Sequence, residues 1–476
     1  MEHSSLHFSS SNSAPALYVW DNTAQVQQYS YTDYWERSND AVLQLQVQGF
    51  IAGDRCAFFA PNTEKTVLIL LACLRLGIIA MPLSPRFPKT LAHDLVRVAN
   101  ARFFNWEKFT DKNVYATDER KESTIEIVLE GDATILCSSG STGIPKMFLH
   151  TARNHALSAI GSAENIPFGK GDCWLASLPL YHTGGYAIFF RALVGQAAIA
   201  LPRSLSFDVA AFTESLVTFP ITHCSLVATQ LYHLLRSEQA VERLRRLKAI
   251  LLGGSAIPET LIKQALEHGL KIYTSYGSTE MASQITTTKA VEHEHLRTSG
   301  SVLPYRELRI SDEGEILVRG GTLAKGQITE QGIKPLTGDD GWYHTGDLGE
   351  IDAIQHLLVR GRRDNMFISG GENIHPENAE RLLLNLPTVL QAIVVPVPHE
   401  IYGFRPVAFV ALEGATMLDK QQIEIIENAI AKHLPRFAIP DAFFPFPEDL
   451  LTSGIKPSRA ELCRRAVELF TCASND

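Results

Sequence analysis

The sequence predicts an α/β protein with a large N-terminal unit of doubly wound sheets and a small α+β unit at the C-terminal end. Through about residue 350, short apolar runs alternate with amphipathic segments, which is typical of strands joined by helices. After the charged residues 362–364 the pattern changes to a compact stretch of helices and strands. The length of 476 residues also favours more than one core.

Apolar runs and amphipathic segments locate the elements of the large unit. A helix is expected over residues 258–268, because Pro258 and Glu259 suit a first helical turn. Another is expected over residues 207–217. The strands, each a short apolar run, are expected over residues 56–60, 135–137, 198–201, 249–252 and 271–274.

The most apolar stretch covers residues 67–83. It predicts a buried helix followed by a strand rather than a membrane span, because Arg75 interrupts it and Pro82 and Pro85 end it.

The small unit is expected to contain two helices and two strands. We expect a flexible arm over residues 1–15, because that segment is polar and rich in serine, a large unit over 16–361 and the small unit over 365–476. The helices are expected over residues 376–386 and 421–434, and the strands over residues 391–397 and 406–412.

Bulk properties exclude several classes of function. The net charge of −9 and the lack of a basic tract argue against binding to nucleic acid or to a membrane surface. The seven cysteines form no C-x-x-C pair, so reduced thiols are expected and a zinc site is not. The first residues lack the apolar core of a signal peptide, and we therefore expect a cytoplasmic protein. The oligomeric state stays open between a monomer and a homo-oligomer.

Residues 138–146 read Ser-Ser-Gly-Ser-Thr-Gly-Ile-Pro-Lys and follow a predicted strand. Hydroxyls and bare backbone amides can wrap a polyphosphate, and glycines let the backbone approach it closely. The segment does not fit the Walker A pattern, because Lys146 follows Gly143 by three positions and no Ser or Thr comes next. The alternative is a surface linker.

Residues 275–280 offer a second ligand-binding pattern. The ring of Tyr276 can stack on a purine, and the carboxylate of Glu280 suits Mg²⁺. The alternative is a strand-to-helix turn that is capped by Ser278 or Thr279.

Three other segments each place one polar side chain near glycines. Taken singly, each has an ordinary alternative: a structural histidine, an Asx turn and a solvated lysine. The side chains are His182 in residues 178–185, Asp347 in residues 344–349 and Lys456 in residues 454–459.

Taken together, the five segments resemble the core motifs of the adenylate-forming superfamily in their chain order and in the distances between them. In chain order they cover residues 138–146, 178–185, 275–280, 344–349 and 454–459. That superfamily includes acyl-CoA synthetases, luciferases and the adenylation domains of peptide synthetases. Four runs are similar to one branch of it, the o-succinylbenzoate–CoA ligases of menaquinone and phylloquinone biosynthesis. They cover residues 225–231, 252–258, 364–372 and 454–459.

Two positions depart from the superfamily pattern. Ile455 stands where a glycine usually precedes the lysine, with Gly454 one residue earlier, an offset that the o-succinylbenzoate–CoA ligases share. Ser369 stands where many relatives have a basic residue.

The resemblance implies a reaction in two steps. A carboxylate attacks the α-phosphate of ATP to give an acyl-adenylate and diphosphate, and the thiol of coenzyme A then displaces AMP. ATP, Mg²⁺ and coenzyme A are therefore expected, and catalysis should rest on positioning and charge neutralisation.

The resemblance also implies roles for individual residues. Lys456 would bridge the carboxylate and the α-phosphate, Thr279 would contact the α-phosphate, Glu280 would hold Mg²⁺, and His182 is expected at the catalytic site. The residues expected to bind the nucleotide are Ser138, Ser141, Thr142, Gly143 and Lys146 for the β- and γ-phosphates, Gly254, Ser255, Ala256, Tyr276 and Gly277 for adenine, and Asp347 and Arg362 for ribose.

The superfamily rotates its small domain between the two steps, which implies a hinge at Asp364 and a coenzyme A tunnel lined by Gly370 and Gly371. The second carboxylate of o-succinylbenzoate needs a cation or several hydrogen-bond donors. Arg191 is our candidate, with a surface-paired arginine as the alternative. Further polar candidates are Ser225, Thr229 and Gln230.

Three other functions stay open. They are a different acyl- or aryl-CoA ligase, an adenylation domain that loads a carrier protein, and a nucleotide-binding protein without activity. The last would be expected to have lost Lys456 or Glu280, and both are present.

Overall fold

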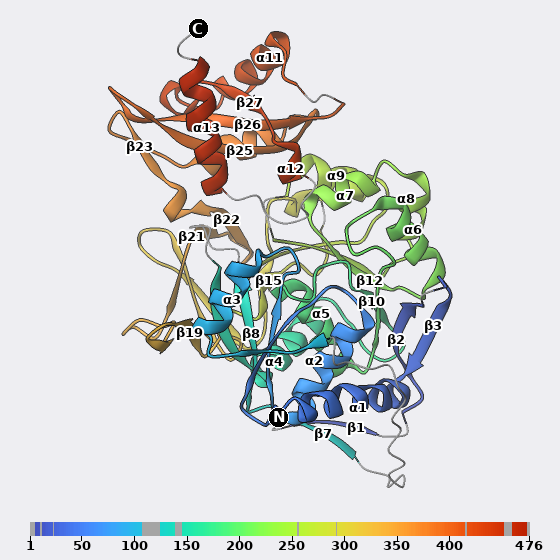
Figure 1. The fold of residues 1–476 in the computed structure, drawn as a ribbon. Coiled ribbons are helices and arrows are strands. Elements are labelled where there is room, and N and C mark those ends of the chain that lie inside the picture. Colours follow the sequence, from blue (N-terminus) through green and yellow to red (C-terminus); the bar gives the residue numbers. More distant parts are fainter. Residues whose placement is uncertain are drawn as a thin grey trace.

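The computed structural model describes residues 5–9, 12–21, 23–106, 124–138, 145–254, 257–291, 293–414, 417–451 and 459–473. A large body carries a smaller unit, coloured orange to red, at its upper end (Figure 1). The predicted fold class is confirmed.

A nine-stranded sheet forms one half of the large body. Its central strands are parallel, and antiparallel strands close both ends. In spatial order the strands are β16 (Ser301–Val302), β15 (Ser283–Thr287), β14 (Ile272–Ser278), β13 (Ala249–Leu252), β12 (His223–Leu226), β10 (Cys173–Leu175), β11 (Ala198–Ala200), β2 (Pro15–Trp20) and β3 (Val26–Ser30).

A seven-stranded sheet forms the other half. The strand pairs β4–β5, β4–β6 and β5–β8 are parallel, whereas β9 is antiparallel to both β8 and β19. In spatial order the strands are β20 (Gly332–Lys334), β19 (Gly326–Thr329), β9 (Lys146–Thr151), β8 (Asp132–Ser138), β5 (Ile79–Leu83), β4 (Arg55–Phe59) and β6 (Arg102–Phe103).

The helices α2 (Glu64–Leu76) and α5 (Thr183–Gly195) are buried over most of their length. The core around them takes side chains from both sheets, including Phe58 and Trp174, so both helices are apolar on nearly all sides. The remaining helices of the body are α1 (Tyr31–Val47), α3 (Lys89–Val98), α4 (Ala152–Ala163), α6 (Val209–Thr218), α7 (Ala228–Leu234), α8 (Glu238–Leu244) and α9 (Glu259–Glu267).

The expected helix and strand over residues 67–83 are α2 and β5. Arg75 lies in the last turn of α2, where its guanidinium rests on the Trp35 ring and donates to Ser38 Oγ at 2.5 Å. Within the described ranges, no helix combines the length and apolar character that crossing a bilayer requires.

A four-stranded sheet leads to the small unit: β17 (Arg306–Ile310), β18 (Glu315–Gly320), β21 (Tyr343–Ile351) and β22 (Leu357–Arg362). One 3₁₀ turn, Arg363–Asn365, follows it. In the small unit, α10 and α11 contribute to one core against β25 and β26, and α13 contributes to a second. Its elements are β23 (Phe367–Ser369), β24 (Glu372–Ile374), α10 (Pro376–Leu384), β25 (Val389–His399), β26 (Gly403–Leu412), α11 (Lys420–Ala431), β27 (Phe443–Pro445), α12 (Glu448–Leu451) and α13 (Arg459–Ala473).

Two local expectations differ from the structure. The polar N-terminal segment is not wholly a loose arm, because β1 (Ser5–Ser9) pairs with β7 (Thr124–Val128) and β2 begins at Pro15. Backbone pairing supplies these hydrogen bonds whatever the side chains are. Residues 275–280 do not lead into a helix: β14 continues to Ser278 and turns back into the antiparallel β15.

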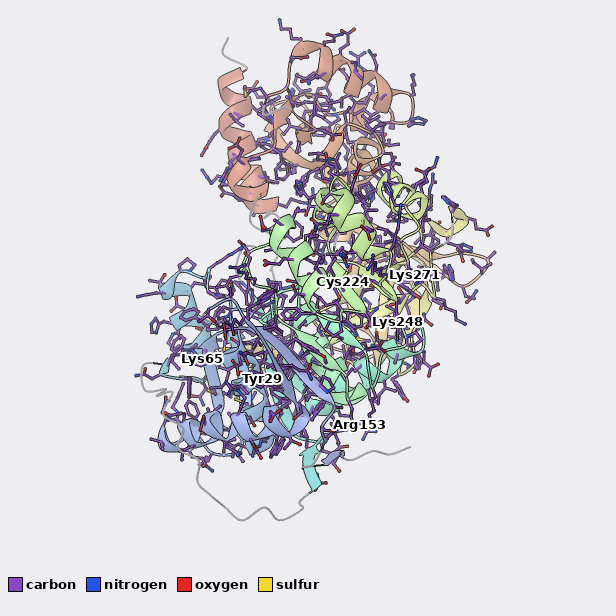
Figure 2. All side chains as sticks on the ribbon, turned by 90° about the vertical axis from the view of Figure 1, so that its right-hand side faces the viewer. Tyr29, Lys65, Arg153, Cys224, Lys248 and Lys271 are labelled. Atoms are coloured by element: carbon purple, nitrogen blue, oxygen red, sulfur yellow. The ribbon has the colours of Figure 1, made fainter. Side chains whose placement is uncertain are left out.

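Six cysteines are free thiols in the described chain. Cys224 lies on β12 inside the large body, below the small unit (Figure 2). Burial raises the pKa of the Cys137, Cys173 and Cys224 thiols, which keeps them protonated and unreactive.

Candidate functional site

The predicted phosphate loop is bordered by the paired hairpin strands β8 and β9. Ser138, the last residue of β8, pairs with Lys146, the first residue of β9. The loop therefore joins two antiparallel strands and does not precede a helix, which agrees with the mismatch to Walker A. Ser141, Thr142 and Gly143 lie outside the described residues.

The turn that carries Thr279 and Glu280 connects β14 to β15 and is held from three sides. The Nε2 atom of His150 lies 2.8 Å from the Thr279 carbonyl oxygen. The amide of Ala324 donates to the Glu280 carbonyl at 2.7 Å. The hydroxyl of Tyr343 donates to Glu280 Oε1 at 3.0 Å. The Glu280 carboxylate is thus oriented before any ligand arrives.

Gly277 has a steric reason to be glycine in this turn. A Cβ there would lie 2.1 Å from the Ser283 carbonyl oxygen, closer than two atoms can pack. Its role next to adenine remains a prediction.

Tyr276, Asp347 and Arg362 are brought together from three strands. The hydroxyl of Tyr276 donates to Asp347 Oδ2 at 2.6 Å, and Arg362 Nη1 donates to Asp347 Oδ1 at 3.1 Å. Burial and the nearby Asp347 charge raise the pKa of Tyr276, so the phenol stays a donor. The predicted adenine and ribose residues therefore share one network. Gly254 follows β13, while Ser255 and Ala256 lie outside the described residues.

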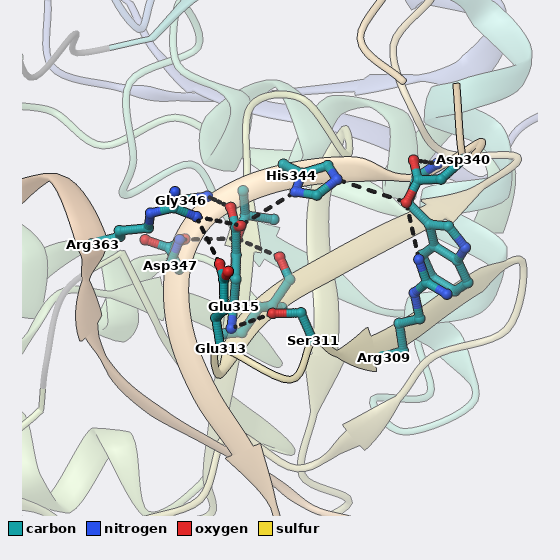
Figure 3. A network of polar contacts seen from close by, with 12 residues as sticks. Arg309, Ser311, Glu313, Glu315, Asp340, His344, Gly346, Asp347 and Arg363 are labelled. Atoms are coloured by element: carbon teal, nitrogen blue, oxygen red, sulfur yellow. Dashed lines mark hydrogen bonds and ion pairs between the residues drawn. The ribbon is translucent and has the colours of Figure 1, made fainter. Parts of the chain in front are cut away.

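Glu315 fixes the stretch of β21 that precedes Asp347, which is a strand and not the Asx turn of the alternative reading. Its buried carboxylate accepts the Gly346 amide at 2.9 Å and lies 3.1 Å from Arg363 Nη1 and 3.2 Å from His344 Nδ1 (Figure 3). The same carboxylate thus connects this stretch of β21 to Arg363, the residue before the predicted hinge at Asp364. Asp364 is exposed and lies 3.4 Å from Arg362 Nη2.

Three buried polar atoms on or next to the predicted motifs have no partner among the described residues. Ser278 Oγ, Thr183 Oγ1 and Arg362 Nε are buried and make no hydrogen bond within the described part of the chain. Such atoms usually have a ligand or a water partner. No group of three metal-ligating side chains occurs in that part of the chain. The role of Glu280 toward Mg²⁺, which retains waters and phosphate oxygens among its ligands, remains a prediction.

His182 precedes the first turn of α5, with its ring centroid 4.6 Å from that of Tyr181. Burial, with a smaller effect of the Arg86 charge, lowers the pKa of His182 to about 4. The imidazole is therefore neutral at pH 7 and can donate or accept one proton.

Arg191 is buried, which rejects the alternative of a surface-paired arginine. Its Nε donates to Ser162 Oγ at 3.2 Å, its Nη2 donates to Gln284 Oε1, and its guanidinium lies 4.8 Å from the Trp174 ring centre. Burial lowers the pKa of Arg191 to about 10, so it stays charged. A cavity of about 30 Å³ is lined by this residue and by Ala159, Ser162, Ala163, Ile166, Phe168, Val194 and Gly195.

No carboxylate among the described residues pairs with Arg191. The neighbouring Arg306 is also buried, and burial together with the charge of Arg191 lowers its pKa to about 9. Arg306 donates to the carbonyls of Gln284 and Pro304, both at 2.7 Å. Two buried cations without an anion favour binding of an anionic group.

The other substrate candidates differ in their surroundings. Ser225 accepts a hydrogen bond from Trp174 Nε1 at 3.1 Å, which places it on the same indole ring as Arg191. Gln230 accepts the Val227 amide at 3.1 Å and so begins α7, a structural role. Thr229 is partly buried on α7.

Gly370 and Gly371 form the two-residue turn between β23 and β24, with φ of 59° and 89°. Positive φ at both positions is what a tight type I′ hairpin requires, so the glycines have a structural reason besides the predicted tunnel.

Lys456 lies outside the described residues, but the start of α13 lies near the ribose residues. Arg459 Nη1 pairs with Glu380 at 2.7 Å, and its Nη2 lies 3.9 Å from Glu377. Glu377 in turn accepts the Arg362 amide at 3.2 Å.

Sequence reasoning missed His150, Tyr343, Glu315 and Glu377. The only available signal was the position of His150 four residues after Lys146 on an alternating strand. The other three become partners of the motifs only through tertiary packing.

Comparison with known proteins gives consistent matches. Residues 9–328 match the AMP-binding enzyme family, and residues 378–453 match the AMP-binding enzyme C-terminal domain. The 2-succinylbenzoate–CoA ligase of Escherichia coli strain K12 is 35% identical over 447 residues, covering 92% of this chain and 93% of the relative. That of Haemophilus influenzae is 34% identical, with 92% and 93% covered.

Solved structures agree with these matches. A variant of E. coli MenE with bound OSB-AMS superposes with a TM-score of 0.81 at 31% identity, covering 96% of both chains. The o-succinylbenzoate coenzyme A synthetase of Bacillus subtilis, in complex with ATP and magnesium ion, has a TM-score of 0.78 at 26% identity, covering 94% of this chain and 96% of that one.

Proposed function

The chain belongs to the AMP-binding enzyme family, and from this premise we propose that it joins 2-succinylbenzoate (o-succinylbenzoate) to coenzyme A. ATP is consumed, and AMP and diphosphate are released. The relatives that share a third of its residues over nearly their whole length are 2-succinylbenzoate–CoA ligases. The reaction belongs to menaquinone and phylloquinone biosynthesis.

Thioester formation from a free carboxylate requires a better leaving group. A carboxylate is a poor acylating agent because an oxide ion would have to leave. Attack of its oxygen on the α-phosphate breaks the bond to diphosphate and converts the acid into an acyl-adenylate. The sulfur of coenzyme A then attacks the acyl carbon, and AMP leaves with the former carboxylate oxygen.

The first step brings negative charges together, so the protein must hold and neutralise them. Asp347 faces the ribose hydroxyls with its orientation set by Tyr276 and Arg362. Mg²⁺, when bound, neutralises phosphate charge. Glu280, oriented by Tyr343, is the protein ligand that the donor set offers it.

The observation that carries the choice of acid is the buried Arg191. A plain aryl or fatty acid would leave this cation, and Arg306 beside it, without an anion. The second carboxylate of o-succinylbenzoate supplies the missing charge, and the guanidinium can bind it through two parallel hydrogen bonds. Ser225, on the same indole ring, is a further donor for that end of the substrate.

We place Lys456 at the reacting atoms in the first step and Gly370 and Gly371 beside coenzyme A in the second, with rotation of the small domain between them. The chain from Arg459 through Glu377 to Arg362 supports the first placement.

The test is the formation of a coenzyme A thioester from o-succinylbenzoate, benzoate and a fatty acid, side by side. We expect kcat/KM to be highest for o-succinylbenzoate by at least about 100-fold. Preference for another acid would select a different acyl- or aryl-CoA ligase. Adenylation without thioester formation would select a carrier-loading domain.

We also propose that the enzyme works in the cytoplasm. The free thiols of the described chain, most of them buried, support a reducing compartment, which is also where ATP and coenzyme A are abundant. Sedimentation of the purified protein decides between a monomer and a homo-oligomer.

A further inference from the structure

His150 connects two parts of the site that lie far apart in the sequence. It is on β9, the strand that leaves the phosphate hairpin at Lys146. Its Nε2 atom lies 2.8 Å from the carbonyl oxygen of Thr279, 129 residues away. A carbonyl oxygen only accepts, so Nε2 carries the proton and donates it.

The imidazole lies in a buried environment. His150 is fully buried, and its ring centroid lies 4.9 Å from that of His155. The hydrogen bond of His155 goes to Thr134 Oγ1 on β8, at 2.7 Å. The two buried rings therefore have different partners: His150 contacts the Thr279 turn, and His155 contacts β8.

The turn that receives this hydrogen bond needs external support. Ala282 and Ser283 have φ of 53° and 108°, which are unfavourable for residues with a side chain. The Ala282 amide donates to the same Thr279 carbonyl at 3.2 Å. The orientation of this one carbonyl thus affects both the turn and the peptide plane that joins Thr279 to Glu280.

We propose that His150 is a positioning residue, whose imidazole holds the Thr279 carbonyl so that the Thr279 hydroxyl and the Glu280 carboxylate face the phosphates. This role rests on the proposed function of the site. The hydrogen bond fixes the position of the Thr279–Glu280 turn, which would contact the α-phosphate and Mg²⁺, relative to β9. Strand β9 follows the predicted loop for the β- and γ-phosphates.

The test compares three variants. His150→Leu removes the donor at similar volume. His150→Gln keeps an N–H donor at about the same reach. His155→Leu is the matched control, because that ring is equally buried but bonds Thr134 instead of the turn. Each is assayed by hydrogen–deuterium exchange of residues 276–285 in the ligand-free protein, and by the two half-reactions.

We expect His150→Leu to speed exchange in the turn at least about tenfold and to lower kcat for adenylation by about 10–100-fold, with KM for the acid changed less than about threefold. His150→Gln should restore most of the protection from exchange and most of the adenylation kcat. His155→Leu should lower the melting temperature yet leave turn exchange and adenylation kcat within about twofold of the wild type.

Unchanged exchange and adenylation in His150→Leu would overturn the proposal, as would a Gln variant no better than Leu. If His150→Leu does not fold, His150→Asn, whose amide is too short to reach the carbonyl, replaces it. Exchange in the ligand-free protein needs no substrate. An error in the proposed acid would instead appear as wild-type inactivity toward o-succinylbenzoate.

Discussion

At the scale of single residues, we propose that acid specificity depends on Arg191. We expect Arg191→Ala to raise KM for o-succinylbenzoate by about 10–100-fold, since a charge-assisted hydrogen bond is lost. KM for benzoate, which has no second carboxylate, should change little. Steady-state kinetics with both acids measures the difference.

Arg191→Lys is the matched variant, because it keeps the charge and loses the planar fork. An intermediate KM for o-succinylbenzoate would support recognition through paired hydrogen bonds. Equal losses for both acids in Arg191→Ala would contradict the assigned role.

Lys456 is the residue that we propose for charge neutralisation in the first step. Lys456→Ala should reduce adenylation by several orders of magnitude, about 10³-fold or more, because the charge between carboxylate and α-phosphate is lost. Thioester formation from supplied acyl-adenylate should be spared. The two half-reactions are measured separately. Equal losses in both would show that Lys456 does not have this specific role in adenylation.

At the scale of elements, the 3₁₀ turn Arg363–Asn365 joins the two parts of the molecule. Asp364→Pro should reduce thioester formation more than adenylation, by about tenfold or more, because proline fixes φ at the pivot. Asp364→Ala, which keeps this freedom, is the control. If both half-reactions of the proline variant match those of Asp364→Ala, the hinge lies elsewhere.

Elements whose apolar residues recur at a regular spacing could be predicted from the sequence. The buried α2 and β5, and α10 with its Pro376 start, lie where apolar spacing and capping residues place them. Strand β1 was missed, because Leu6 and Phe8 are its only apolar residues in a serine-rich segment and its partner β7 lies more than 100 residues away.

Only those residues of the site that lie in local sequence motifs could be predicted. Glu280 and Asp347 stand in segments with their own pattern. Tyr343, which bonds Glu280, and Glu315, which bonds the Gly346 amide, come from strands that meet these residues only in the folded protein. Arg191 was suggested by a charge that follows the apolar run 187–190 and by the resemblance to the superfamily, but its lack of a carboxylate partner among the described residues is visible only in three dimensions.

At the scale of the whole molecule, buried neutral histidines should make stability depend on pH. Burial, as the largest effect, lowers the pKa of His150, His182 and His223 to about 4, and that of His155 well below its usual value. Their stabilising contribution is therefore complete above pH 6.5 and is lost as the pH falls toward 4, where only the unfolded chain binds protons readily.

We expect the free energy of unfolding to fall by roughly 1–2 kcal/mol for each such histidine between pH 7 and pH 5. Urea unfolding at several pH values measures this. The interval avoids the protonation of Asp21 and Glu461, whose pKa values lie at about 2 because of their hydrogen bonds to Thr23 and to Arg464, respectively. Constant stability over the interval would mean that these imidazoles are solvated.

We propose that the buried Arg191, which pairs with no carboxylate in the described part of the chain, selects an aryl acid with a second carboxylate. The most direct measurement is coenzyme A thioester formation by the wild-type enzyme from o-succinylbenzoate and from benzoate, with ATP and Mg²⁺. Rapid thioester formation from o-succinylbenzoate and little from benzoate is the predicted result. Equal rates, or a thioester formed only from the acid without a second carboxylate, would contradict the account.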